Sequence, residues 1–429
     1  MDAGATTSPL LRLPDELLLA VFEHIAQDEH EKLQAPWRRA MPPPGYLLIS
    51  KRLNRVLTPR WYRMIALPWV AGGDRPYSLL LSRPSITPLI HELDIWFPLE
   101  RVHTCLWTVS QLVALRRLVI TIFDSRTEGT YDPDDESHSL AQVDESLAAL
   151  FRKLPYLVDF AIDVDFESDV QISGLDLGLC LATAQIRRLE VPGSMFELPR
   201  LGNIKLQHLT LCGAVSRPIF PLSELETLSF TGSGSVTLTT MQPFFDQYAT
   251  YAHETGASPR LSLLKVNDGY AKYYQFASTS VLDLVTFLEQ LSSTNIPKLD
   301  LTVCVKLDMS TRTIPPLRNV KTLRLHLPVP VLETSGMVLI AELIRRFSSL
   351  TRLSLRLRTT VHEKNDDDDP QPIWTTTRFC RTFPGIPTLV KDLSDTTEIT
   401  QFVFERSQGS FVWTRDNASR ELESRQICD

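Results

Sequence analysis

Apolar residues near the start of the chain recur at helical spacing. Leu17 is followed by four more apolar residues at offsets of one, four, five and eight positions, namely Leu18, Val21, Phe22 and Ile25. This spacing places them on one face of a helix. Pro14 suits the first turn of that helix because its missing N–H costs nothing there. The pattern predicts an amphipathic helix that buries one face.

A second stripe with the same period follows after a long polar and proline-rich segment. Its members are Ile49, Leu53, Val56 and Leu57. Thr58 has the side chain of a helix N-cap and Pro59 suits a first helical position, so a third short helix is predicted to carry Trp61 and Tyr62. Three short helices bury little surface, and the module therefore needs a partner or a neighbouring domain.

From residue 90 onward a different pattern, apolar-x-x-apolar-x-apolar, returns about eleven times. The alternation at its end predicts a short strand whose apolar residues face inward. The matches are Ile90/Leu93/Ile95, Leu115/Leu118/Ile120, Leu157/Phe160/Ile162, Ile186/Leu189/Val191, Leu206/Leu209/Leu211, Leu225/Leu228/Phe230, Leu261/Leu264/Val266, Ile296/Leu299/Leu301, Val320/Leu323/Leu325, Leu350/Leu353/Leu355 and Ile399/Phe402/Phe404.

Several of these strands follow a segment with helical periodicity. Such segments precede the strands at Leu157, Ile296 and Leu350. A helix, a turn and a strand in each unit, stacked side by side, is typical of a leucine-rich repeat, whose parallel strands line a concave face. The spacings run from roughly 19 to roughly 49 residues, where regular repeats span about 20–29. A generic α/β protein with amphipathic strands is the alternative.

The N-terminal residues resemble an F-box. The resemblance lies in the order of Leu13-Pro14-x-Glu16, Val21-Phe22-x-x-Ile25, Ser50-Lys51-Arg52-Leu53 and Trp61-Tyr62. The whole chain is similar to the F-box proteins of mushroom-forming fungi. The resemblance implies that this module docks onto a Skp-type adaptor and, through it, a cullin. The residues it assigns to the adaptor interface are Leu13, Pro14, Leu17, Val21, Ile25, Ile49 and Leu53.

The expected fold is α/β, with a small all-α F-box module followed by an irregular leucine-rich-repeat solenoid. The expected divisions are a disordered tail over 1–8, the F-box over 9–70, the solenoid over 71–405 and a C-terminal tail over 406–429. Loop insertions are expected near 124–140 and 360–376, where acidic residues are concentrated. The segment Gln27 to Tyr46 is longer than the usual F-box linker, which puts adaptor affinity in question.

In strands of this type the residues beside the inward apolar ones point to the concave surface and form the predicted substrate groove. The candidates are Asp94, Trp96, Asp163, Arg324, His326, Arg352, Arg356 and Arg358. The acids come early and the arginines late, so we expect a partner with the complementary order of charge. The alternative is that these are ordinary solvated strand residues.

Composition narrows the class of protein. The chain has 429 residues, 43% of them hydrophobic and 22% charged, with a net charge of −7. This profile fits a folded protein and argues against a broad electrostatic grip on nucleic acid or an anionic membrane. The six cysteines are scattered, and the first residues lack the features of a secretory signal. We therefore expect a cytoplasmic or nuclear protein without membrane or nucleic-acid partners.

The sequence lacks the motifs of catalysis. The nine histidines show no metal-ligand spacing, and there is no phosphate-binding, nucleophile-elbow or kinase motif. We expect no catalytic residue, metal or cofactor. The sequence predicts a non-catalytic substrate receptor of a Skp-cullin-F-box ubiquitin ligase that recruits an unknown protein substrate. A repeat scaffold that recruits no ligase is one alternative, and an enzyme whose site leaves no sequence signature is another.

Overall fold

A computed structural model of the chain divides into two compact units. The first comprises Met1–Val170 and Leu175–Ile186, and the second comprises Gln171–Gly174 and Arg187–Asp429. The residues that the structure describes are 9–22, 24, 46–67, 83–98, 101–123, 146–165, 185–192, 205–212, 220–231, 241–267, 281–302, 316–328, 334–358, 385–406, 409–415 and 422–427.

Short helices open the first unit. A 3-10 helix, η1 (Pro9–Arg12), precedes a helix over 15–22, and α2 (Tyr46–Ile49) precedes α3 (Lys51–Arg63). Ser50 is the N-cap of α3, because its side chain accepts a hydrogen bond of 3.0 Å from the N–H of Leu53. The core of this helical module consists of Leu18, Phe22, Leu53 and Leu57, each at most 2% exposed. The two predicted apolar stripes therefore pack against each other.

The third helix predicted to begin at Pro59 does not exist as a separate element. α3 runs without a break from Lys51 to Arg63, and Pro59 lies inside it. Thr58 is no N-cap, and its hydroxyl donates instead to the side chain of Asn54, four residues earlier, at 3.1 Å. Burial of Leu53 and Leu57 on one face of the helix stabilises it enough to accept the hydrogen bond lost at Pro59.

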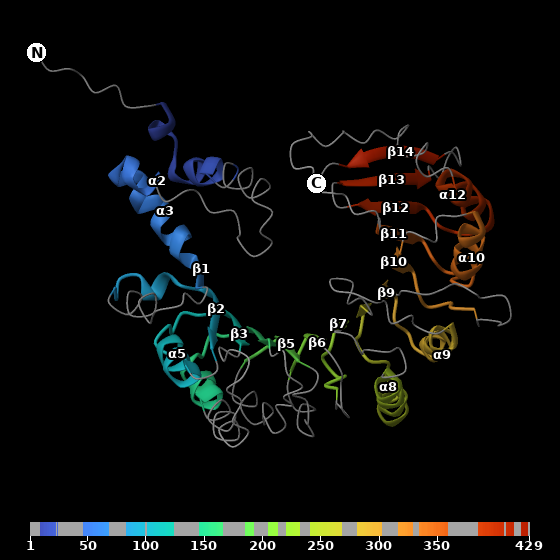
Figure 1. Ribbon diagram of the computed structural model, residues 1–429, viewed down its shortest axis with the longest axis horizontal. Helices are drawn as coiled ribbons and strands as arrows, with labels where there is room; N and C mark the ends of the chain where they lie inside the picture. The colour runs from blue at the N-terminus through green and yellow to red at the C-terminus, as the bar shows by residue number, and fades with distance from the viewer. Residues whose placement is uncertain are drawn as a thin grey trace, which may run out of the picture. The chain divides into compact units, whose positions relative to one another are not determined.

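A parallel sheet forms the rest of the first unit. Its strands are β1 (Met64–Leu67), β2 (Glu92–Pro98), β3 (Arg117–Phe123) and β4 (Asp159–Asp165), paired in chain order. The 3-10 helix η2 (Thr87–Leu89), the helix α5 (Val102–Val109) and a helix over 146–153 connect them. Helix α5 lies on one side of β2 and β3 (Figure 1), as right-handed crossovers require.

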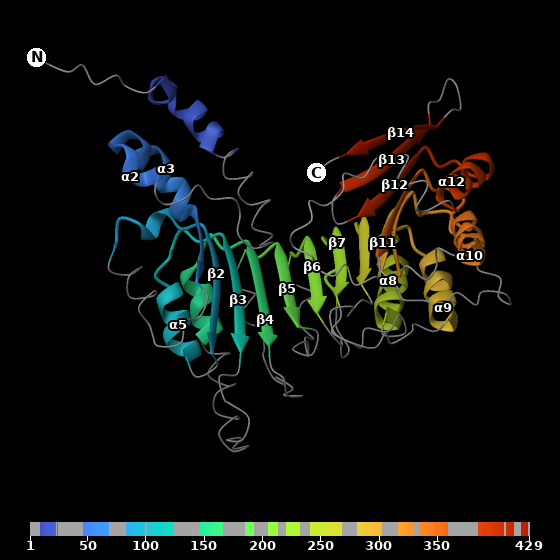
Figure 2. The ribbon, with the colours of Figure 1, turned by 45° about the horizontal axis from the view of Figure 1, so that its top comes forward.

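The second unit continues the same construction. Eight parallel strands pair in chain order, namely β5 (Arg188–Pro192), β6 (His208–Cys212), β7 (Thr227–Thr231), β8 (Leu263–Asn267), β9 (Lys298–Thr302), β10 (Thr322–Pro328), β11 (Arg352–Arg358) and β12 (Gln401–Arg406). The helices α8 (Gln242–Thr255), α9 (Val281–Ser292), α10 (Thr334–Arg345) and α12 (Gly385–Thr396) lie together on one side of β8 to β12 (Figures 1 and 2).

The predicted repeat pattern is confirmed by burial. Every residue of the eleven apolar triplets is buried, none more than 2% exposed. In the second unit the middle residues of successive triplets are directly paired across the strands and form a continuous apolar ladder. Its members are Leu189, Leu209, Leu228, Leu264, Leu299, Leu323, Leu353 and Phe402. Stacked units that share this strand, though not the same length, define a solenoid-like α/β repeat fold.

The segment 406–429, expected to follow the repeats as a tail, contains two strands. β13 (Gly409–Arg415) pairs antiparallel with β12, and β14 (Leu422–Ile427) pairs antiparallel with β13. Phe404 and Trp413 pack edge to face with ring centroids 5.1 Å apart. The apolar side chains Phe411, Val412 and Trp413 are all buried, which explains why this segment joins the sheet.

Several predicted features lie outside the described residues. These are the tail over 1–8, the segment Gln27 to Tyr46 except for its last residue, and the whole of the two expected loops near 124–140 and 360–376. Of the helices that the structure describes, none has the length and apolar character to cross a membrane.

Candidate functional site

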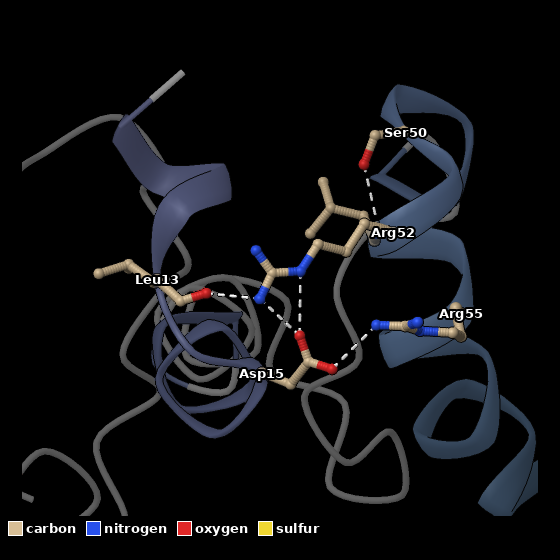
Figure 3. A network of polar contacts seen from close by, with 6 residues as sticks. Leu13, Asp15, Ser50, Arg52 and Arg55 are labelled. Atoms are coloured by element: carbon tan, nitrogen blue, oxygen red, sulfur yellow. Dashed lines mark hydrogen bonds and ion pairs between the residues drawn. The ribbon is translucent and has the colours of Figure 1, made fainter. Parts of the chain in front are cut away.

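A network of polar contacts fixes the helix over 15–22 against α3 (Figure 3). Arg52 donates to Oδ1 of Asp15 from Nε at 3.0 Å and from Nη2 at 2.6 Å, and Nη2 also donates to the carbonyl of Leu13 at 2.6 Å. Arg55 donates to the other carboxylate oxygen of Asp15 at 3.2 Å. The hydrogen bond from Arg52 is the main reason why the pKa of Asp15 lies below its ordinary value. The planar guanidinium thus joins the two predicted helices at one point.

The structure sorts the predicted adaptor-binding residues into core and surface. Leu53 is 1% exposed and belongs to the core of the module, and Leu13 is partly buried against that core. Leu17 and Ile49 are 52% and 60% exposed. Pro14 is exposed, Val21 is half-buried, and Ile25 lies outside the described residues.

The sequence prediction missed one strongly exposed apolar side chain. Leu48 is 87% exposed and directly precedes Ile49 in α2. The signal was present, because Leu47, Leu48 and Ile49 form an apolar run that a single helix face cannot bury completely. Leu17, Leu48 and Ile49 together give the helical module three large apolar side chains in contact with water.

The second candidate surface is the open face of the sheet in the first unit, defined here as the strand positions that alternate with the buried apolar ones. At one end of this face, Glu92, Arg117 and Asp159 lie opposite one another on β2, β3 and β4. Arg117 lies 3.9 Å from Glu92 and 3.7 Å from Asp159, and Arg63 lies 3.9 Å from Glu92. The positive charge of Arg117 is therefore shared between two carboxylates.

The predicted groove residues Asp94, Trp96 and Asp163 are brought onto this open face. Asp163 pairs with Thr121, which pairs with Trp96, and Asp94 lies two residues before Trp96 on β2. Trp96 is 40% exposed and donates a side-chain hydrogen bond to Asp94. Burial raises the pKa of Asp94, and the contact with Trp96 and the charge of Arg117 act in the opposite direction.

The predicted basic residues fall in the second unit. Arg324 and His326 on β10 pair with Ser354 and Arg356 on β11, and Arg358 pairs with Pro328. Arg352 is exposed and lies between Thr322 and Gln401. For His326, Arg356 and Arg358 only the backbone is among the described residues.

Arg324 is not an isolated basic group. It lies 3.6 Å from Asp300, its register partner on β9, a residue that the groove prediction omitted. Asp300 carried a signal, since it occupies the position between Leu299 and Leu301 that defines the groove in every repeat. The early acids and the late arginines thus lie in different units, and the preference for a charge order stays a prediction.

Among the residues described, no group of three or more histidine, cysteine or acidic side chains is placed to hold a metal ion. Several charged residues of the open faces are held in ion pairs with a neighbouring strand, as Arg117 is with Glu92 and Asp159, and Arg324 with Asp300. Such an arrangement can bind a partner through charge and shape.

Comparison with known proteins gives no identification. No family model matches the chain, and no curated protein sequence matches it. A protein from Bacteroides fragilis, whose crystal structure comes from structural genomics, is similar at 12% identity, over 69% of this chain and 67% of that chain. The TM-score is 0.32, too low to establish a shared fold. The class of the molecule therefore rests on its own architecture, a solenoid-like α/β repeat fold preceded by short helices.

Proposed function

We propose that the protein is a substrate receptor of a Skp-cullin-F-box ubiquitin ligase. In this proposal the N-terminal helical module is an F-box that binds a Skp-type adaptor, and the sheet is a leucine-rich-repeat solenoid that binds the protein to be ubiquitinated. The receptor contributes proximity and orientation, and the bond chemistry belongs to other subunits.

The observation that carries the proposal is the exposure of apolar side chains on the helical module. Leu17, Leu48 and Ile49 are each more than half exposed, whereas four of the side chains described in this module form its core. Exposed apolar side chains on so small a module favour a partner that covers them. Burying one leucine completely stabilises a complex by roughly 1.5–3 kcal/mol before the costs of association.

The repeat sheet supports the second half of the proposal. Parallel strands stacked in register present the open-face side chains of adjacent strands as one extended surface. In the first unit this surface carries Trp96, Asp94 and Asp163, which are residue types suited to selecting a partner. A receptor needs such a surface beside its docking module.

Capture of a Skp-type adaptor by the full chain tests the proposal. The wild-type protein is expected to retain the adaptor and the Leu17→Asp variant to lose it, because a charge buried against an apolar surface costs several kcal/mol. Loss of at least about 100-fold in affinity follows from a cost near 3 kcal/mol. Failure of the wild-type chain to capture any adaptor, while an established F-box protein succeeds, would refute the proposal.

Val113→Asp is the matched control. Val113 is 57% exposed, close to the 52% of Leu17, but it lies in the loop before β3 and outside the helical module. This variant is expected to capture the adaptor as well as wild type. Equal loss in both variants would indicate a general effect of a new surface charge and would remove the support from the helical module. Capture of other proteins but no adaptor would favour a repeat scaffold that recruits no ligase.

A further inference from the structure

The strands β2, β3 and β4 of the first unit are each entered through the same tight turn. The N–H of the first residue of the apolar triplet donates to the carbonyl three residues earlier, at 3.3 Å for Ile90, 3.0 Å for Leu115 and 3.2 Å for Leu157. These three residues are buried, so the turn is fixed from inside the repeat. The two residues in the middle of each turn are defined here as the turn row: Pro88-Leu89, Val113-Ala114 and Pro155-Tyr156.

Backbone hydrogen bonds hold the three turns side by side. Directly after the turns, the N–H of Arg116 donates to the carbonyl of His91 at 2.8 Å, and the N–H of Val158 donates to the carbonyl of Arg116 at 2.9 Å. The turns therefore form one edge of the sheet, at which the three strands begin. On this edge Val113 is 57% exposed and Tyr156 is 63% exposed, and Val158 is 36% exposed. The edge thus presents large apolar side chains to water.

The repeat itself does not require apolar residues in these turns. Four turns of the second unit, which precede the triplets beginning with Leu225, Val320, Leu350 and Ile399, have polar residues at the equivalent positions. These residues are Ser223-Glu224, Arg318-Asn319, Ser348-Ser349 and Thr397-Glu398. The same fold therefore accepts polar residues at this place, and exposed apolar side chains in the turn row favour a partner that covers them.

Positive charge surrounds the turn row. The described segments 83–91, 110–116 and 152–158 contain three arginines, one lysine and no acidic residue, although the whole chain has a net charge of −7. The exposed cations of these segments that enter no ion pair with another described residue include Arg116, Arg152 and Lys153. Their charge is therefore not neutralised by the described part of the chain.

We propose that the turn row and its cations bind an acidic segment of a partner protein that carries an aromatic or aliphatic side chain. The carboxylates of the segment pair with Arg116, Arg152 and Lys153, because the charges are complementary. The apolar side chain of the segment packs against Val113 and Tyr156. Tyrosine and arginine are both enriched in protein interfaces, where they combine apolar area with polar groups.

The combination of charge and apolar area favours a protein segment over other anions. Phosphate groups of a nucleic acid would use the cations but leave the exposed valines without a partner, and the net charge of −7 opposes both nucleic acid and an anionic membrane. The inference goes beyond the proposed function, because the turn row lies at the edge of the sheet and not in the helical module. It holds whether or not the chain recruits an adaptor.

The test uses the full chain and a fluorescent peptide, Gly-Asp-Glu-Phe-Asp-Leu-Glu-Gly, with fluorescence anisotropy at physiological salt. Two further peptides separate the two contributions: one has serine in place of phenylalanine and leucine, and the other has amides in place of the four carboxylates. Only the first peptide is expected to bind well. Tyr156→Ser is expected to weaken its binding about tenfold, as for an aromatic interface residue. Arg116→Gln is expected to weaken it about two- to fivefold, as for an exposed ion pair.

Val113→Asp and Ser348→Asp form a matched pair. Both residues are exposed and lie two positions before the first residue of a triplet, Leu115 and Leu350, but only Val113 belongs to the turn row. Val113→Asp is expected to weaken binding at least about tenfold, because it adds repulsion and removes apolar contact. Ser348→Asp is expected to bind as wild type does. Both variants are expected to keep the unfolding temperature of wild type, since neither side chain is part of the core.

Three outcomes would overturn the inference: no binding of the acidic and aromatic peptide, equal binding of all three peptides, or equal effects of Val113→Asp and Ser348→Asp. Binding of phosphatidylserine vesicles that is lost in Tyr156→Ser, without binding of the peptide, would indicate a membrane surface and also overturn it. Adaptor capture distinguishes the two proposals, because Val113→Asp is expected to lose the peptide and keep the adaptor, whereas Leu17→Asp is expected to lose the adaptor and keep the peptide.

Discussion

Leu53 and Ile49 provide a direct test of how the N-terminal helices are built. Both residues were predicted to contact an adaptor, but Leu53 is 1% exposed in the core with Leu18, Phe22 and Leu57, whereas Ile49 is 60% exposed. Leu53→Ala is therefore expected to destabilise the module by about 2–5 kcal/mol, the cost of removing a fully buried leucine side chain. Ile49→Ala is expected to change the stability by no more than about 0.5 kcal/mol.

Amide hydrogen exchange in the helix over 15–22 and in α3 measures this difference within the full chain. A loss of 2–5 kcal/mol corresponds to exchange that is faster by about 30-fold to about 5,000-fold, up to the limit set by complete opening of the module. Ile49→Ala is expected to accelerate exchange by about twofold or less. Exchange in β5 to β12 is expected to be unchanged in both variants and serves as the internal control. If the two variants opened the helices equally, the assignment of Leu53 to the core would be wrong.

Two further predictions concern the same helices. Pro59→Ala is expected to stabilise α3 by about 2 kcal/mol in the same exchange measurement, because it restores the hydrogen bond to the carbonyl of Arg55. Pro88→Ala in η2, where the proline lies in the first turn, is expected to be close to neutral, and a larger gain there would contradict the reasoning. The pKa of Asp15 is lower in the folded chain than its ordinary value of 3.8, so its stabilising effect is complete above that pH and is lost as the pH falls through the lower, folded-state pKa. Asp15→Asn is accordingly expected to make the helical circular dichroism signal less dependent on pH in the acid range. An unchanged pH dependence would show that the contact with Arg52 contributes nothing to stability.

The repeat architecture could be predicted from the sequence because each strand repeats one local pattern. All eleven apolar triplets are buried, since a strand with alternating apolar residues has only one face to offer a core. The two terminal strands were harder to predict. β13 carries Phe411, Val412 and Trp413 in succession, a run without clear alternation, and its burial depends on Phe404 from an adjacent strand. Such a contact between strands cannot be inferred from local periodicity.

The sequence could predict on which face of the sheet the candidate residues lie, but not which residues surround them. Alternation placed Asp94 and Trp96 on the open face. Only strand register shows that Asp94 has Ala66 and Val119 as its neighbours, and its Oδ1 has no hydrogen-bond partner among the described residues. The sequence also could not show that Leu18 is buried while Leu17 is exposed, because adjacent leucines fit a helical stripe about equally well. The position of α3 decides which of the two is buried.

The reversal of strand direction at β13 has a consequence for how such a protein can grow. Each parallel strand needs a crossover segment on the covered side of the sheet, whereas β13 follows β12 after two residues and needs none. Duplication of a helix and strand can therefore lengthen the array between existing parallel strands, where the new strand finds parallel neighbours on both sides. A copy added after β14 would meet a strand that is itself paired antiparallel, so its new strand would not have parallel neighbours on both sides. Gene duplication is thus expected to change the number of parallel repeats while leaving the antiparallel hairpin of β13 and β14 unchanged.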